Sequence, residues 1–338
     1  MSWLTISEDK QHFIRDNEPF FWVGDTVWSA FTNASVEDWK EYLAFRKKQG
    51  FNVLQINTLP QWDRIGPDLG LHPYPIREDG SMDYTAEPNE AFINHTRTLC
   101  YMAVEAGFTL CLAVVWADII PETWLTGAFP SHTWPLEYVE KHVRRVVDAY
   151  NEFHPVYMVC GDTNFDSPQA VAYVKRASEL LKKLAPEALR TFHMIADADT
   201  VPEELLPYMD FCVYQSGHRG AEKLEALPTE MKKKYPGYPL LNAEPCYEAM
   251  PHLTENWDEP PIEFFSAQDV VEACRRSVAA GANAGITYGA NGLWNWRRSN
   301  GPVVTQASKW YADPVTWKEA MHFPAAEQIA ALKELSGI

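Results

Sequence analysis

The chain has 338 residues, of which 46% are hydrophobic, 22% are charged and 13% are aromatic, and this composition excludes a disordered protein or a small disulfide-stapled scaffold. Asp and Glu number 46 against 29 Lys and Arg, giving a formal net charge of −17. That field would repel nucleic acid and anionic membrane surfaces, so we expect neither as a partner.

Short apolar runs alternate with longer amphipathic segments along the whole chain. The short runs are typical of strands buried on both faces, and the longer segments are typical of helices. The predicted strands are 20–24, 52–56, 109–115, 156–160, 191–195, 211–214, 240–243 and 284–287. Eight strands, each followed by a helix, predict an α/β protein that is a single (β/α)8 TIM barrel rather than a doubly wound sheet. We expect residues 1–338 to form one domain.

Helix boundaries are marked by capping residues. A helix is predicted from Ser35, where the sequence resembles a capping box, to Gly50, which suits a left-handed C-cap. Pro168 after Ser167 opens a further helix, and Ser266 begins another capping box. The remaining predicted helices are 90–106, 136–153 and 324–335.

The N-terminus shows no basic start followed by an apolar stretch, and no run of eighteen apolar residues occurs. We therefore expect a cytoplasmic protein without a signal peptide or a membrane span. The six cysteines are scattered without CxxC pairs and lie mostly in apolar runs, which favours reduced, buried thiols over disulfides or a zinc site.

Acidic residues at the C-terminal ends of the predicted strands are the candidates for catalysis, because TIM-barrel active sites lie on that face. They are Asp25, Asp118, Asp162 and Glu244. Asp162 has no evident capping role, since Asp166 and Ser167 lie nearer to the start of the next helix. Glu244 follows an apolar run directly, and a buried glutamate is costly unless it is paired or used. Glu248 is expected to orient a neighbour or to be solvated.

Two carboxylates across a barrel mouth suit the cleavage of a glycoside. One protonates the departing oxygen while the other attacks the anomeric carbon or activates water. Five tryptophans fall just beyond strand ends, where indole rings can stack on sugars, although any one of them can equally pack in the core. They are Trp28, Trp62, Trp116, Trp294 and Trp296. We therefore expect a small carbohydrate substrate.

Further candidates surround these carboxylates in the sequence, each with two interpretations. Tyr214 is expected to hydrogen-bond the nucleophilic carboxylate or to pack in the barrel. His218 contacts substrate or is an ordinary loop histidine, and Asp25 binds sugar hydroxyls or fixes the turn at residues 25–26. Asn164 is an additional candidate for substrate binding.

Five segments, taken together and in order, resemble the apiosidase-like catalytic domains, a group that includes glycoside hydrolase family 140. They are 24–28 (GDTVW), 161–162 (GD), 214–218 (YQSGH), 244–248 (EPCYE) and 287–294 (TYGANGLW), which adds Tyr288 to the candidate substrate-binding residues. The resemblance implies a retaining glycosidase with its acid/base on the fourth strand and its nucleophile on the seventh. By position these are Asp162 and Glu244. A cytoplasmic enzyme would meet short glycosides, so we expect exo-action on small glycosides or oligosaccharides.

Two other functions remain open from the residues alone. The first is a metal-dependent sugar isomerase or hydrolase with Asp25, Asp162, Glu244 and His218 as ligands. The second is a sugar-binding protein without catalysis. Because the ten histidines are dispersed and no nucleotide-binding motif follows the first strand, we expect no metal and no cofactor.

Overall fold

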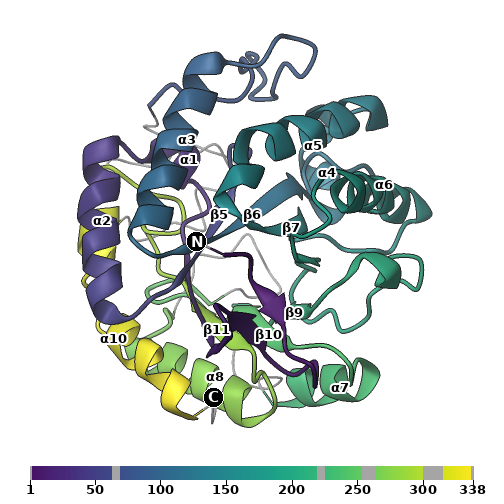
Figure 1. Ribbon diagram of the computed structural model, residues 1–338. Helices are drawn as coiled ribbons and strands as arrows, with labels where there is room; N and C mark the ends of the chain where they lie inside the picture. The colour runs from purple at the N-terminus through teal and green to yellow at the C-terminus, as the bar shows by residue number, and fades with distance from the viewer. Residues whose placement is uncertain (1, 63–68, 219–224, 253–262, 300–314, 336–338) are drawn as a thin grey trace.

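The computed structural model describes residues 2–62, 69–218, 225–252, 263–299 and 315–335. Eight parallel strands form one sheet in the order β8-β7-β6-β5-β4-β11-β10-β9. They are β4 (Trp22–Thr26), β5 (Val53–Asn57), β6 (Thr109–Trp116), β7 (Val156–Gly161), β8 (Arg190–Thr191), β9 (Cys212–Gln215), β10 (Leu240–Glu244) and β11 (Gly285–Tyr288). Figure 1 shows them surrounded by helices, which confirms the predicted (β/α)8 barrel.

Hydrogen bonds between the two ends of this strand order close the barrel. The backbone N–H of Asp210 donates to the carbonyl of Arg190 at 2.9 Å, and the N–H of Asp197 donates to the carbonyl of Gln215 at 3.3 Å. The Thr191 hydroxyl donates to the carbonyl of Phe211 at 2.8 Å. The segments around β8 and β9 therefore lie side by side, as closure requires.

The helices follow the strands as expected, except between β8 and β9, where only a 3₁₀ turn, Leu206–Tyr208, is found. They are α1 (Ala30–Asn33), α2 (Val36–Gln49), α3 (Glu90–Glu105), α4 (Trp124–Ala128), α5 (Leu136–Tyr150), α6 (Pro168–Leu184), α7 (Ala226–Lys234), α8 (Ala267–Ala279), α9 (Trp317–Ala320) and α10 (Ala325–Ala330). Ser35 caps α2 by accepting from the N–H of Asp38, and Gly50 ends it with φ of 98°. Ser266 and Asp269 form a full capping box on α8. These local predictions are confirmed.

The fifth barrel strand is shorter than predicted, at 190–191 instead of 191–195. Backbone hydrogen bonds between the segment after β8 and the end of β7 nevertheless continue on both sides of Asp162. The N–H of His193 donates to the carbonyl of Cys160, and the N–H of Ile195 donates to the carbonyl of Thr163. Asp162 itself adopts a left-handed conformation with φ of 50°. The ladder is interrupted there because a residue in this conformation turns the chain out of the regular pleat.

A small antiparallel sheet precedes the barrel and was not predicted. It consists of β1 (Thr5–Ile6), β2 (Phe13–Arg15) and β3 (Glu18–Phe20). The fully buried Phe13 packs edge-on against Phe211 with ring centroids 4.9 Å apart, and it also contacts Trp22. Since these two residues precede or begin barrel strands, the sheet covers the N-terminal end of the barrel.

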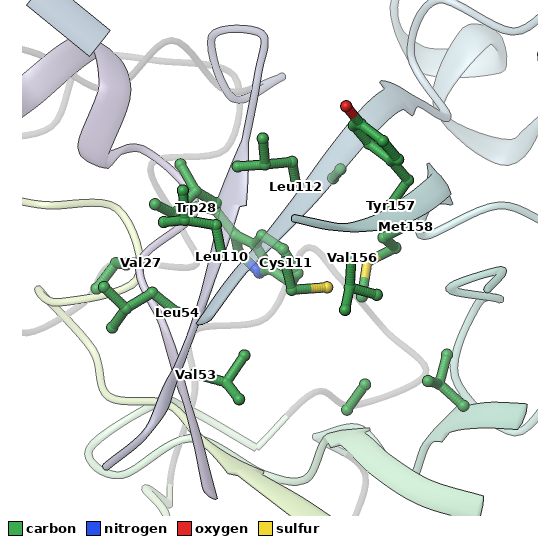
Figure 2. Packing of buried hydrophobic residues seen from close by; sticks show 14 of the residues in the cluster. Val27, Trp28, Val53, Leu54, Leu110, Cys111, Leu112, Val156, Tyr157 and Met158 are labelled. Atoms are coloured by element: carbon green, nitrogen blue, oxygen red, sulfur yellow. The ribbon is translucent and has the colours of Figure 1, made fainter. Parts of the chain in front are cut away.

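Apolar side chains on neighbouring strands build the core on both faces of the barrel wall. Figure 2 shows Val53 and Leu54 of β5 beside Leu110 and Leu112 of β6, with Met158 of β7 beyond them. All five are buried. Strands buried on both faces read as continuous apolar runs, which is why the sequence located them well.

The structure also bears on what the sequence indicated about the cysteines and about membrane spans. All six cysteines are free and buried, as predicted. Within the described residues, none of the helices combines the length and apolar character needed to cross a membrane.

Candidate active site

A cavity of about 280 Å³ lies at the C-terminal ends of the barrel strands. Its aromatic wall consists of Trp28, Trp62, Trp116, Trp124, Trp294 and Tyr247. Its polar residues are Gln61, Asp162, Gln215, His218 and Glu244, and Ile195, Ala196 and Met250 complete the lining. The two predicted catalytic carboxylates and four of the five predicted tryptophans therefore meet in one cavity.

Asp162 follows the last residue of β7, and its surroundings favour the protonated acid. Its Oδ1 accepts a hydrogen bond from Gln215 Nε2 at 2.8 Å, and the same amide nitrogen donates to the carbonyl of Met194 at 2.7 Å. Burial and the neighbouring charge of Glu244 raise the pKa of Asp162 to about 6. Asp162 can therefore hold a proton under weakly acidic conditions.

Glu244 ends β10, and two histidines face its carboxylate. His218 Nε2 lies 3.3 Å from Oε1, and His193 Nε2 lies 3.4 Å from Oε2. Burial alone would raise the pKa of Glu244, but the hydrogen bonds and charges of the two histidines outweigh it and lower the pKa to about 2. Glu244 is thus held as a carboxylate.

Backbone N–H groups set the tautomer of both histidines. The N–H of Asp162 donates to His193 Nδ1 at 3.2 Å, and the N–H of Tyr247 donates to His218 Nδ1 at 3.3 Å. Each Nδ1 therefore accepts, so in the neutral ring the proton lies on Nε2 and faces Glu244. His193 links the backbone of one carboxylate residue to the side chain of the other.

Both carboxylate residues lie at irregularities of the backbone. Asp162 has a positive φ, and the register between β10 and β9 shifts between Asn242 and Glu244. Asn242 Oδ1 accepts from the N–H of Glu244 at 3.2 Å, which supports the shifted strand. Such features re-aim side chains at the rims of barrels and are frequent at active sites.

Close packing fixes the tryptophan floor of the cavity. The rings of Trp28 and Trp116 meet edge to face with centroids 5.1 Å apart, and both lie beside His193. A Cβ at Gly161 would stand only 2.0 Å from the Trp116 ring. The glycine before Asp162 is therefore needed for the close approach of this indole.

Tyr247 lies beside Glu244 and is held in place by Trp28 and His218. Its hydroxyl accepts from Trp28 Nε1 at 3.2 Å, and its ring packs edge-on to His218 with centroids 4.7 Å apart. A Cβ at Gly289 would lie 2.2 Å from the Tyr247 ring. The pKa of Tyr247 is raised by burial and by the charge of Glu244, so its hydroxyl stays protonated.

Asp25 does not reach the cavity, so its assignment to substrate binding is corrected. Its Oδ2 accepts from Arg46 Nε at 2.5 Å and from the Tyr42 hydroxyl at 2.6 Å, and all three side chains are fully buried. Successive side chains of a strand point to opposite faces, and Asp25 points outward toward α2. It joins the barrel to its helical layer.

Tyr214 and Tyr288 are corrected for the same reason. Tyr214 is fully buried and is absent from the cavity lining, whereas the next residue, Gln215, points inward. The Tyr288 hydroxyl donates to Glu248 Oε2 at 2.7 Å outside the cavity. The hydrogen bonds to the Glu244 carboxylate that were expected from Tyr214 come from His193 and His218 instead.

Trp296 and Asn164 also lie away from the lining of this cavity. The ring of Trp296 stacks on Trp317 at 5.0 Å and is fully buried among aromatic residues. Asn164 Oδ1 accepts from the backbone N–H of Trp124 at 2.9 Å, and Asn164 lines a neighbouring cavity. Trp296 therefore has a packing role.

The two remaining acids are structural as well. Asp118 Oδ2 lies 3.0 Å from His132 Nδ1 in a buried pair. Glu248 orients a neighbour, as one interpretation of the sequence expected, because it accepts from Tyr288 and from the N–H of Ala325 at 3.2 Å.

Five polar or aromatic residues of the site were missed from the sequence: Gln61, Trp124, His193, Gln215 and Tyr247. His193 falls inside the predicted strand 191–195, and Gln215 directly follows the predicted strand 211–214, so inward-facing alternation was an available signal for both. Tyr247 lies on a loop and Trp124 begins the five-residue helix α4, and neither segment is long enough for a periodic pattern to indicate direction.

The metal-dependent alternative required Asp25, Asp162, Glu244 and His218 to converge, but Asp25 lies on the outer face of the barrel wall. Within the part of the chain that the structure describes, there is no group of three or more His, Cys, Asp or Glu side chains placed to hold a metal ion. The donor set of that alternative therefore does not assemble.

Solved structures similar to this chain are glycoside hydrolases. A glycoside hydrolase family 5 protein from Bacteroides vulgatus matches with a TM-score of 0.78 at 19% identity, covering 98% of this chain and 71% of that one. A protein titled a glycoside hydrolase matches with a TM-score of 0.77 at 20% identity, covering 98% and 74%. A glycoside hydrolase family 5 mannosidase from Rhizomucor miehei matches with a TM-score of 0.66 at 12% identity, covering 99% of this chain and 97% of that one. At these identities the likeness concerns the fold.

The sequence comparison goes further than the fold. No curated protein matches the chain. The model of the apiosidase-like catalytic domain, however, matches residues 7–337. The chain therefore belongs to the apiosidase-like catalytic domain family and is a glycoside hydrolase.

Proposed function

We propose that this glycoside hydrolase is a retaining, exo-acting enzyme on small glycosides or oligosaccharides, with Asp162 as acid/base and Glu244 as nucleophile. The observation that carries the proposal is that two carboxyl groups line one cavity in surroundings that shift their pKa values in opposite directions, to about 6 for Asp162 and about 2 for Glu244. Environments that push two such pKa values apart mark the acid and the anion of a catalytic pair.

In the first step, the Glu244 carboxylate attacks the anomeric carbon while Asp162 gives its proton to the departing glycosidic oxygen. The C–O bond to the leaving group breaks as the glycosyl–enzyme ester forms. Gln215 holds Oδ1 of Asp162, which leaves Oδ2 to carry the transferred proton. In the second step, Asp162 takes a proton from water, the resulting hydroxide attacks the anomeric carbon, and Glu244 leaves as a carboxylate.

The cavity supports exo-action on a small substrate. Its volume of about 280 Å³ lies just below the range of most ligand pockets, which span roughly 300–1,000 Å³. That space suits one sugar ring. The indole faces of Trp28, Trp116 and Trp294 supply apolar walls for its C–H groups.

The test uses aryl glycosides, including apiosides, arabinosides, fructosides, glucosides and galactosides, to find a substrate. On that substrate Asp162→Asn and Glu244→Gln should each lower turnover by several orders of magnitude. The matched control is Asp148→Asn, an exposed residue of α5, which should leave turnover unchanged. Near-normal turnover in either cavity variant would overturn the assignment.

Azide and product stereochemistry decide the mechanism. Azide should restore turnover only in Asp162→Asn, because it then reaches the glycosyl–enzyme ester without needing a base. Nuclear magnetic resonance of the first-formed sugar should show the anomeric configuration of the substrate. An inverted first product would rule out double displacement while leaving the enzyme class intact.

A further inference from the structure

A second cavity of about 450 Å³ adjoins the first one. Trp124 and Ile195 line both cavities and form the boundary between them. We call the first one the inner cavity and the second one the outer cavity. The outer cavity is also lined by Asn164, Phe165, Asp166, Ala198 and Thr200.

Trp124 is fixed to the segment that carries Asp162. Its indole Nε1 donates to the backbone carbonyl of Asp162 at 2.8 Å, and its backbone N–H donates to Asn164 Oδ1 at 2.9 Å. Its ring also meets Trp62 edge to face with centroids 6.3 Å apart. The indole at the boundary is therefore held in place before any ligand arrives, which lowers the entropic cost of stacking a ligand on it.

The order of the chain places the outer cavity on the side of the acid. Asp162 lines the inner cavity, and the residues that follow it, 163–166, line the outer one. A carboxylic acid that protonates a glycosidic oxygen must lie beside the leaving group. With the glycone in the inner cavity, the leaving group extends past Trp124 into the outer cavity.

The two cavities differ in chemistry. In the inner cavity, the Gln215 amide and the His218 ring are already bonded within the protein. In the outer cavity, two aromatic rings stand beside a polar rim. Asp199 and Thr200 belong to this rim, and both contact Lys234, whose ammonium donates to Thr200 Oγ1 at 2.9 Å and pairs with Asp199 at 2.6 Å.

We propose that the outer cavity binds the leaving group and that this group is a second sugar ring. A pyranose or furanose has apolar C–H faces that stack on indole and hydroxyl groups around its edge, which is the pattern of this cavity. The inference rests on the proposed function, and it adds the class of the leaving group. Asn164, expected from the sequence to bind substrate, lies here rather than beside the nucleophile.

The experiment blocks the outer cavity and compares two substrates with the same glycone. One is a glycosyl fluoride, whose leaving group is a single atom, and the other is a disaccharide. Ala198→Phe fills the outer cavity from a partly buried position. Ala106→Phe is the matched control, because Ala106 is also partly buried but lies at the end of α3, on the opposite face of the barrel.

Ala198→Phe should lower kcat/KM on the disaccharide by at least about tenfold and change it less than about twofold on the fluoride. Ala106→Phe should change neither. Thr200→Trp, at an exposed position of the same cavity, should reproduce the selective loss if Ala198→Phe folds poorly. A tenfold loss of kcat/KM corresponds to about 1.4 kcal/mol, which is the size expected for the loss of one stacked or hydrogen-bonded contact.

Equal losses on both substrates, or no loss in either cavity variant, would overturn the inference. That outcome differs from failure of the proposed function, in which the wild-type enzyme hydrolyses neither substrate. Hydrolysis of the fluoride but not of any disaccharide by the wild type would also reject a sugar as leaving group.

Discussion

Asp162 and Glu244 line one cavity, yet their surroundings have opposite effects on ionisation. Asp162 receives one neutral amide donor and the repulsion of a nearby carboxylate, whereas Glu244 faces two imidazole N–H groups. Burial opposes ionisation at both. The difference shows that in a buried site the number and kind of donors, rather than burial itself, decides which carboxyl keeps its proton.

The pH profile of kcat/KM is the most direct test of this difference between Asp162 and Glu244. Because Asp162 must be protonated to act as the acid, kcat/KM should approach a tenfold fall per pH unit above about pH 6, or about a fiftyfold fall between pH 6 and 8. On the acid side, activity should persist until Glu244 is protonated near pH 2, provided that the protein stays folded. A profile that stays flat from pH 6 to 8 would contradict the assignment of Asp162.

Stability should respond to the two carboxyls in opposite directions. Since the pKa of Asp162 is raised from 3.8 to about 6, the folded state gains stability from this group below pH 3.8 and loses it as pH rises through 6. Asp162→Asn should therefore raise the free energy of unfolding at pH 8 by up to about 3 kcal/mol. The gain should vanish below about pH 4.

Glu244→Gln is the opposing control in the same measurement by thermal or urea unfolding. The pKa of Glu244 is lowered from 4.5 to about 2, so its contribution is present above pH 4.5 and is lost as pH falls through 2. This variant should unfold more easily at pH 8. Equal effects of the two substitutions would show that the environments do not differ as described.

The smallest expected effects concern the donors themselves. Gln215→Met removes the donor to Asp162, so the pKa of Asp162 should rise and the basic limb of the pH profile should move upward by roughly 0.7 pH units. His218→Phe removes a donor to Glu244 and should instead move the acid limb upward. Movement of both limbs by one substitution would mean that the two networks are not separate.

The sequence located most of the framework because the relevant signals are local. Apolar runs identified all eight barrel strands, and capping residues such as Ser35 and Ser266 set helix starts. Strand-end position also selected Asp162 and Glu244, which the structure brings to one cavity. It selected Asp25 and Asp118 equally, however, and these are buried elsewhere, Asp25 paired with Arg46 and Asp118 in contact with His132.

What the sequence by itself determined was therefore the barrel, the order of its elements and a short set of acids at one face. Only the tertiary structure decided which face of each strand a side chain occupies, because one residue of shift exchanges inward and outward positions. Gln215 points inward and Tyr214 outward for this reason. The two histidines that hold Glu244 ionised lie 51 and 26 positions away in the sequence. Pairing of β9 with β10 brings His218 to Glu244, and closure of the barrel between β8 and β9 brings His193.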